Sequence, residues 1–187
     1  MKTIEALVAV VALAAVPAAG VRPAAAAPAR GCAYDSMLFG DGTSIRVTVP
    51  ATEACSIGSY TVAIAAKGSP AQTIKLKRDG TVVNVFFEDV TGDGKRDLVV
   101  VTTAAGSGAY GHVDVWEWKR GRYTAGIVAD LTEEQRAGTR GHDTFTAAAG
   151  VLRRRLPVYA AGDANSSPTG GTAAFRWDAK QNVWIPE

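Results

Sequence analysis

The sequence is poor in the residues that most often carry metal or catalytic chemistry. Its 187 residues include only two cysteines and two histidines, and the net charge is +2. A structural zinc site takes four such ligands, so it would need both cysteines and both histidines, and the histidines are too distant in the sequence from the cysteines for us to expect one. A nearly neutral chain also lacks the basic surface that binds nucleic acid through bulk electrostatics. We therefore expect any partner to be recognised by shape and local contacts.

The first 26 residues have the pattern of a secretory signal peptide. Lys2 precedes the apolar run ALVAVVALAAV (6–16), and small residues follow up to a predicted cleavage near Ala26, with Ala19 as the alternative. This run is shorter than the ~20 residues that a membrane-spanning helix needs. We predict an exported protein, periplasmic or secreted, in which residues 27–187 form one domain without a membrane attachment after cleavage.

The two cysteines are predicted to form a disulfide. Cys32 and Cys55 both follow the signal peptide, and an even number of cysteines in an exported chain favours a bond between them. Closing a loop of this length would stabilise the fold by roughly 3 kcal/mol, because it restricts the unfolded chain.

The remaining sequence is typical of strands joined by tight turns. The segment TSIRVTV (43–49) alternates apolar and polar residues, whereas DLVVVTTA (97–104) is apolar on both faces and indicates a central strand covered on both sides. Asp79-Gly80 predicts a hairpin, and LTEEQRAG (131–138) predicts one short helix that opens with a capping box. We expect an all-β fold, an antiparallel β-sandwich or flattened barrel of about eight to ten strands with one short helix.

The segment DVTGDGKRD (89–97) resembles the start of a calcium loop. The residues on alternate positions, which would supply the ligands, are Asp89, Thr91, Asp93, Lys95 and Asp97. Thr91 is a weak ligand, and Val100 stands where such a loop has its bidentate carboxylate. Two interpretations stay open: a calcium site, or a tight hairpin whose glycine and aspartate residues serve the turn.

The segment TAAGSGAYGH (103–112) is an uncharged loop between two apolar strands. It has more glycines than a hairpin turn requires. Ser107 can donate and accept hydrogen bonds, and Tyr110 combines apolar area with a phenol, as interface anchors do. A loop without carboxylates can also enter an acidic cleft at little electrostatic cost. Composition indicates a protruding recognition loop, with a flexible connection as the alternative. The candidate partner-binding residues are Gly106, Ser107, Gly108, Tyr110, Gly111 and His112.

The evidence for an enzyme is weak, and we predict a non-enzymatic protein. Ser107 lies in AGSGA, where Ala105 replaces the first glycine of a G-x-S-x-G nucleophile elbow. A hydrolase that pairs Ser107 with His142 is a further hypothesis, which would require turnover that disappears with Ser107→Ala.

Several segments in order resemble one known family. They are DVTGDGKRDLVVVTTAAGSGAYGHVDVWEW (89–118), GHDTF (141–145), LRRRLPVY (152–159) and GDANSSPTGGT (162–172). Together they are similar to the PliI-like periplasmic inhibitors of invertebrate-type (I-type) lysozyme. The similarity runs from about residue 80 to the C-terminus.

The resemblance implies an all-β periplasmic protein that plugs the substrate cleft of a lysozyme with a loop. The serine and tyrosine of that loop correspond to Ser107 and Tyr110, which would hydrogen-bond near the catalytic carboxylates. It also implies an I-type lysozyme as protein partner. We expect no cofactor unless residues 89–97 bind calcium. Some family members dimerise, so a homodimer is an alternative to a monomer. The alternative function is a calcium-stabilised envelope-binding module of unknown ligand, which would use residues 89–97.

Overall fold

The computed structural model describes residues 32–187, so the predicted signal peptide lies outside the described residues. Alternating apolar residues place most of this chain in strands. The strands are β1 (Tyr34–Gly40), β2 (Thr43–Val49), β3 (Ile57–Ala66), β4 (Gln72–Asp79), β5 (Thr81–Glu88), β6 (Asp97–Thr103), β7 (Gly111–Lys119), β8 (Arg122–Ala125), β9 (Thr144–Ala148), β10 (Val151–Pro157), β11 (Thr172–Asp178) and β12 (Val183–Pro186), and the helix α1 (Glu133–Arg136) lies between β8 and β9.

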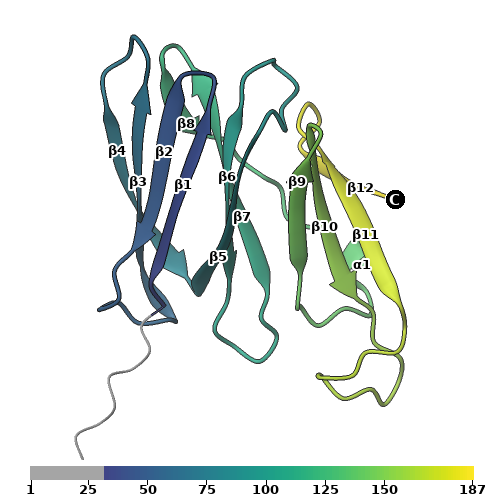
Figure 1. Ribbon diagram of the computed structural model, residues 1–187. Helices are drawn as coiled ribbons and strands as arrows, with labels where there is room; N and C mark the ends of the chain where they lie inside the picture. Colours follow the sequence, from purple (N-terminus) through teal and green to yellow (C-terminus); the bar gives the residue numbers. More distant parts are fainter. Residues whose placement is uncertain (1–31) are drawn as a thin grey trace, which may run out of the picture.

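The strands form three antiparallel sheets of four strands each, in the orders β1-β2-β3-β4, β5-β6-β7-β8 and β12-β11-β10-β9. The β5–β8 sheet lies between the other two (Figure 1). The all-β prediction is confirmed. Residues 32–187 contain twelve strands, more than the eight to ten expected, and their sheets are open rather than closed into a barrel. The pattern missed β1, whose Met37 and Phe39 are apolar but exposed, and β8, which has only four residues.

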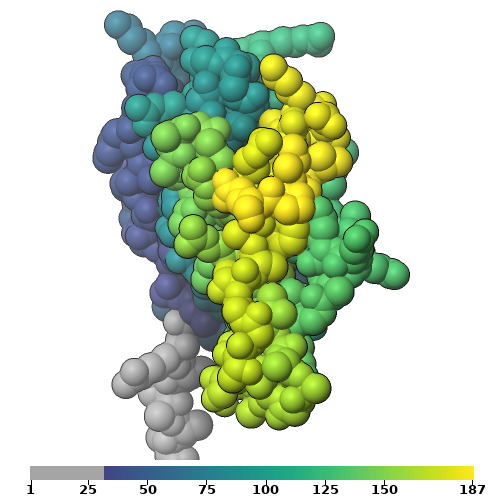
Figure 2. All heavy atoms as spheres, turned by 90° about the vertical axis from the view of Figure 1, so that its right-hand side faces the viewer, coloured from purple at the N-terminus to yellow at the C-terminus, as the bar shows by residue number. Residues whose placement is uncertain are grey.

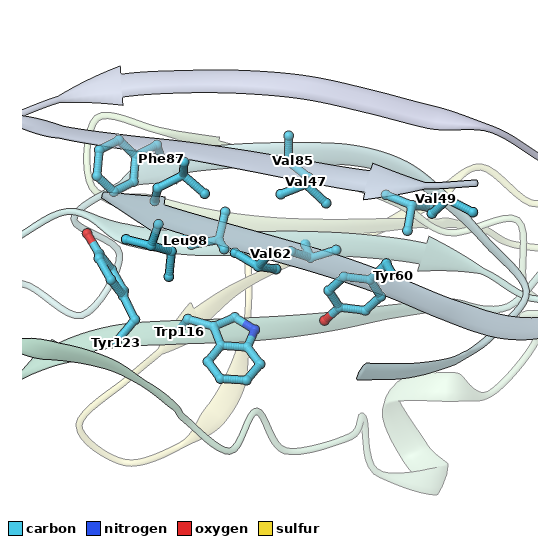
Figure 3. Packing of buried hydrophobic residues seen from close by; sticks show 13 residues of the cluster. Val47, Val49, Tyr60, Val62, Val85, Phe87, Leu98, Trp116 and Tyr123 are labelled. Carbon is cyan, nitrogen blue, oxygen red and sulfur yellow. The ribbon is translucent and has the colours of Figure 1, made fainter. Parts of the chain in front are cut away.

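Strand β6 is buried on both faces, as its continuous apolar run predicted. Leu98 and Val100 pack into a core shared with the β1–β4 sheet, which also contains Tyr60 and Trp116 (Figure 3). Val99 lies in a second core, shared with the β9–β12 sheet. The fold is therefore a sandwich of three layers, and β6 is central to both cores.

The predicted hairpin at Asp79-Gly80 is wrong. Strands β4 and β5 belong to different sheets, and the chain passes from one layer to the next at Gly80. This glycine has a φ of +99°, and a Cβ there would lie 2.0 Å from the Thr103 carbonyl oxygen. Glycine is required at this position because the backbone crosses the end of β6 at close range, not because it turns back on itself.

The local predictions of the disulfide and the helix are confirmed. Cys32 and Cys55 are bonded. The helix α1 opens with the capping box of Thr132 and Gln135, and Gln135 also donates to the Trp184 carbonyl oxygen at 2.6 Å. Over residues 32–187, no helix is long and apolar enough to cross a membrane.

The three-layer arrangement predicts that both faces of β6 contribute to stability. Val99→Ala and Val100→Ala should each lower the free energy of unfolding by about 2 kcal/mol, since each removes methyl groups from a different closed core. Val83→Ala makes the same change at a bulge of β5 where the side chain is 50% exposed, and should cost less than about 0.5 kcal/mol. Urea denaturation measures all three. A near-neutral effect of either core variant would show that one face of β6 is open.

Candidate functional site

The uncharged loop predicted from the sequence connects β6 to β7. It projects at the lower end of the middle sheet in Figure 1. The amide of Ala104 donates to the Tyr110 carbonyl oxygen at 2.9 Å, and the amide of Ala109 donates to the Gly106 carbonyl oxygen at 2.9 Å. These bonds give the loop a defined turn, so it is more than a flexible connection.

The two side chains expected to recognise a partner lie at the surface. The Tyr110 side chain is 55% exposed, and Ser107 is also exposed. Neither is folded back into a core, so the loop presents a hydroxyl and a phenol to the outside. We refer to residues 104–110 as the Ser-Tyr loop.

The glycines of this region have different roles. A Cβ on Gly108 would lie 2.5 Å from the Tyr110 ring, and a Cβ on Gly111 would lie 2.6 Å from the Phe145 ring. A Cβ on Gly106 would have no atom within 4 Å. Gly108 and Gly111 therefore allow close packing, whereas no neighbouring atom requires a glycine at position 106.

His112 lies at the base of the loop and belongs to a polar chain. Its Nε2 is 3.3 Å from Asp114 Oδ1, and the Tyr60 hydroxyl donates to Asp114 Oδ2 at 2.7 Å. The hydrogen bond to Asp114 raises the pKa of His112, against the opposing effect of burial. Burial works against ionisation of Asp114, but the hydrogen bonds from His112 and Tyr60 outweigh it and lower the pKa of this carboxyl. His112 is thus tied to the β1–β4 side of the molecule.

A buried ion pair fixes the opposite side of the loop base. Arg154 of β10 hydrogen-bonds Asp143 through Nε at 3.0 Å and also through Nη2, and its Nη2 lies 3.4 Å from the Gly111 carbonyl oxygen. The guanidinium also lies over the Phe145 ring, 5.3 Å from its centroid. Removing either charge would leave the other buried without compensation.

The sequence did not predict this pair, because Arg154 stands in a run of three arginines that is typical of a solvated strand. The available signal was the alternation along β10, in which Leu152, Arg154 and Leu156 share the buried face. An arginine at a core position predicts an acidic partner, although it does not identify that partner.

The carboxylates of the 89–97 segment are directed at its own backbone. Asp89 accepts hydrogen bonds from the amides of Gly92, Asp93 and Gly94, at 2.8 to 3.1 Å. Asp93 accepts one from the amide of Lys95 at 2.8 Å. These are the bonds of a tight turn whose aspartates orient backbone amides.

Asp97 closes this turn from inside the protein. One of its carboxylate oxygens accepts hydrogen bonds from the amide and hydroxyl of Thr91, at 2.9 and 3.0 Å. Burial raises the pKa of Asp97 to about 6. No group of three histidine, cysteine, aspartate or glutamate side chains within residues 32–187 is arranged to hold a metal ion. Calcium binding by residues 89–97 therefore stays a prediction, and the hydrogen bonds of this turn are those of its alternative, a tight hairpin.

A comparison with protein families decides the identity of the chain. The family model described as periplasmic lysozyme inhibitor of I-type lysozyme, PliI, matches residues 34–131, which is more than half of the sequence. This chain belongs to the PliI family. As a PliI protein it is a periplasmic lysozyme inhibitor and not an enzyme, as predicted. The matched range contains β1–β8 and the Ser-Tyr loop. It differs from the predicted extent at both ends: it begins before residue 80, and it stops at residue 131, short of the segments 141–145, 152–159 and 162–172. The β9–β12 sheet lies outside it.

Solved structures give further similarities. PliI of Aeromonas hydrophila has 25% sequence identity and a TM-score of 0.43, with 50% of this chain and 90% of that chain covered. The same inhibitor in complex with Meretrix lusoria lysozyme has 25% identity and a TM-score of 0.42, with 55% and 93% covered. A Xanthomonas type IV secretion system related protein has 13% identity and a TM-score of 0.38, with 82% and 92% covered. No curated protein matches the sequence.

The buried ion pair predicts an asymmetry within the arginine run. Arg154→Met should lower the free energy of unfolding by about 3 kcal/mol or more, because it leaves Asp143 buried without its partner. Arg155→Met is the matched control on the exposed face of the same strand and should cost less than about 0.5 kcal/mol. The double variant Arg154→Met/Asp143→Leu should recover part of the loss. Equal effects of the two single variants in urea denaturation would contradict the assignment.

The turn geometry of residues 89–97 predicts that calcium does not stabilise this member of the PliI family. The melting temperature should differ by less than about 1 °C between millimolar calcium and a chelator, because a ligand that does not bind the native state leaves its stability unchanged. A rise of several degrees that Asp93→Ala abolishes would instead support the calcium-stabilised module.

Proposed function

We propose that this PliI protein inhibits an I-type lysozyme by inserting the Ser-Tyr loop into the substrate cleft of the enzyme. The exposed Tyr110 phenol, on a loop inside the family-matched range, is the observation that supports this mode most directly. Ser107 and Tyr110 would hydrogen-bond in the cleft, and Gly106 would let the backbone enter a narrow slot.

The charge of the loop suits the chemistry of such a cleft. A glycoside hydrolase uses a pair of carboxyl groups on either side of the scissile bond. No charged residue occurs between Asp97 and Asp114 other than the titratable His112, so the loop brings no carboxylate into contact with that pair. Hydroxyl donors to a carboxylate form charge-assisted hydrogen bonds, which are stronger than neutral ones. A neutral loop with two hydroxyls thus gains attraction without the repulsion that an acidic loop would meet.

One inhibitor molecule is sufficient for this mode. The loop and its supports all come from a single copy of the chain, so blocking the cleft does not require a second copy. The homodimer stays a prediction.

Tyr110→Ala should weaken inhibition of an I-type lysozyme by about 2 kcal/mol or more, roughly a 30-fold rise in the inhibition constant, as expected for a central aromatic anchor. Tyr110→Phe should lose only the hydrogen bond, about 1 kcal/mol. Meretrix lusoria lysozyme is a suitable enzyme for a cell-wall lysis assay. Phe39→Ala is the matched control, because Phe39 is 69% exposed and its neighbour Gly40 packs beside Arg96, at the end of β6 opposite the loop.

Two results would contradict the proposal. The first is a wild-type protein that leaves I-type lysozymes active at micromolar concentration. The second is an inhibition constant that rises equally in Tyr110→Ala and Phe39→Ala.

A further inference from the structure

We infer that the β9–β12 sheet, which lies outside the PliI match, is a brace that holds the Ser-Tyr loop in its binding conformation, with Asn165 as a positioning residue. This inference rests on the proposed function of the loop. Its basis is that two segments attached to this sheet, residues 139–143 and 158–171, contact the backbone of the loop directly. The 158–171 segment projects at the lower end of the molecule in Figures 1 and 2, which is the end where Figure 1 shows the loop.

The first contact is between two backbones. The amide of His142 donates to the Gly108 carbonyl oxygen at 2.8 Å. Gly141, with a φ of +89°, lies so close that a Cβ there would be 1.8 Å from the same oxygen. The 139–143 segment therefore touches the loop between Ser107 and Tyr110, and it can do so only because residue 141 has no side chain.

The second contact comes from a side chain far away in the sequence. Asn165 Nδ2 donates to the Ser107 carbonyl oxygen at 2.7 Å, although the two residues are 58 positions apart. The same nitrogen lies 3.3 Å from His142 Nε2. Asn165 thus links the loop to both segments of the brace, and it holds the backbone of Ser107 while leaving its hydroxyl free to meet a partner.

Asn165 is itself held in place. The Tyr159 hydroxyl donates to the Asn165 carbonyl oxygen at 3.0 Å. Asp163 accepts hydrogen bonds from the amides of Ala160 and Thr169, both at 2.7 Å, and these fold the 158–171 segment into a closed shape. Arg140 donates to the Asp163 carbonyl oxygen at 2.8 Å and so joins this segment to the 139–143 segment.

The base of the loop is secured by the same sheet. Arg154 lies near the carbonyl oxygen of Gly111, the first residue of β7, and is paired with Asp143 of the 139–143 segment. The β9–β12 side of the molecule therefore holds the loop at Ser107 and Gly108, and holds the strand that follows it at Gly111.

Such bracing matters because the loop is rich in glycine. A flexible loop loses conformational entropy when it enters a cleft, which weakens binding, and ordering the loop beforehand reduces that loss. In this PliI protein the ordering is supplied by a sheet that follows the family-matched segment in the chain.

A matched pair of glycine substitutions tests the backbone contact. Gly141→Ala and Gly162→Ala place a methyl group at positions that both have a φ of +89°, but Gly162 has no atom within 4 Å of the new Cβ. We expect Gly141→Ala to raise the inhibition constant at least about tenfold and Gly162→Ala to change it by less than about twofold. Similar inhibition constants for the two variants would overturn the inference.

Asn165→Ala tests the side-chain contact, with Ser166→Ala as the control at an exposed neighbour in the same segment. Loss of one supporting hydrogen bond should raise the inhibition constant roughly threefold to tenfold. In the free protein, hydrogen exchange of the Ala109 and His142 amides should accelerate by a similar factor, because both amides depend on the loop conformation. Ser166→Ala should change neither quantity.

The exchange measurement separates this inference from the proposed function, since it needs no lysozyme. Weaker inhibition by Asn165→Ala with unchanged exchange would mean that Asn165 contacts the enzyme directly, and would overturn the brace. Faster exchange in Asn165→Ala would support the brace whatever the inhibition assay shows. If Tyr110→Ala then left the inhibition constant unchanged, the proposed function would be contradicted while the brace would stand.

Discussion

Burial of both faces of β6 is the constraint on which the rest of this structure depends. Leu98 and Val100 close one core and Val99 and Val101 close the other, so the middle sheet requires a cover on each side. This two-sided packing fixes the strand that leads into the Ser-Tyr loop. It also brings the β9–β12 sheet beside the loop, where the two can share hydrogen bonds. A loop on the end of a strand buried on one side only would have neither support.

The charged side chains near the Ser-Tyr loop lie at its base and not on the loop itself. The loop that is proposed to enter the lysozyme cleft is neutral, whereas the charges around its base are paired. Arg154 and Asp143 are buried together on one side, and His112 lies beside Asp114 on the other. Placing charges at the base strengthens the support without adding carboxylates to the contact surface. Burying Arg154 and Asp143 costs desolvation energy, but their hydrogen bonds hold both side chains in one geometry. Such a pair is suited to fixing the backbone at Gly111.

Local patterns predicted much of this arrangement. Four features could be predicted because each depends on a short segment or on a simple count of residues. They are the apolar run of β6, the capping box of α1, the uncharged composition of the loop and the pairing of the two cysteines. The hairpin at Gly80 was wrong because a turn signal does not say whether the returning strand pairs with its neighbour or crosses to another layer. The Asn165 contact could not be predicted, because it joins two polar segments 58 residues apart and leaves no periodicity in either. The burial of Arg154 was not predicted either, although the alternation along β10 could have indicated it; nothing nearby in the sequence identifies Asp143 as its partner.

The central claim is that the Ser-Tyr loop and the substrate occupy the same space on the lysozyme. Competition between this PliI protein and a soluble peptidoglycan fragment tests it most directly, with binding to an I-type lysozyme measured at increasing fragment concentration. The account predicts that the apparent dissociation constant of the inhibitor rises in proportion to the fragment concentration once the cleft begins to fill. An apparent dissociation constant that stays unchanged while the fragment saturates the enzyme would contradict it.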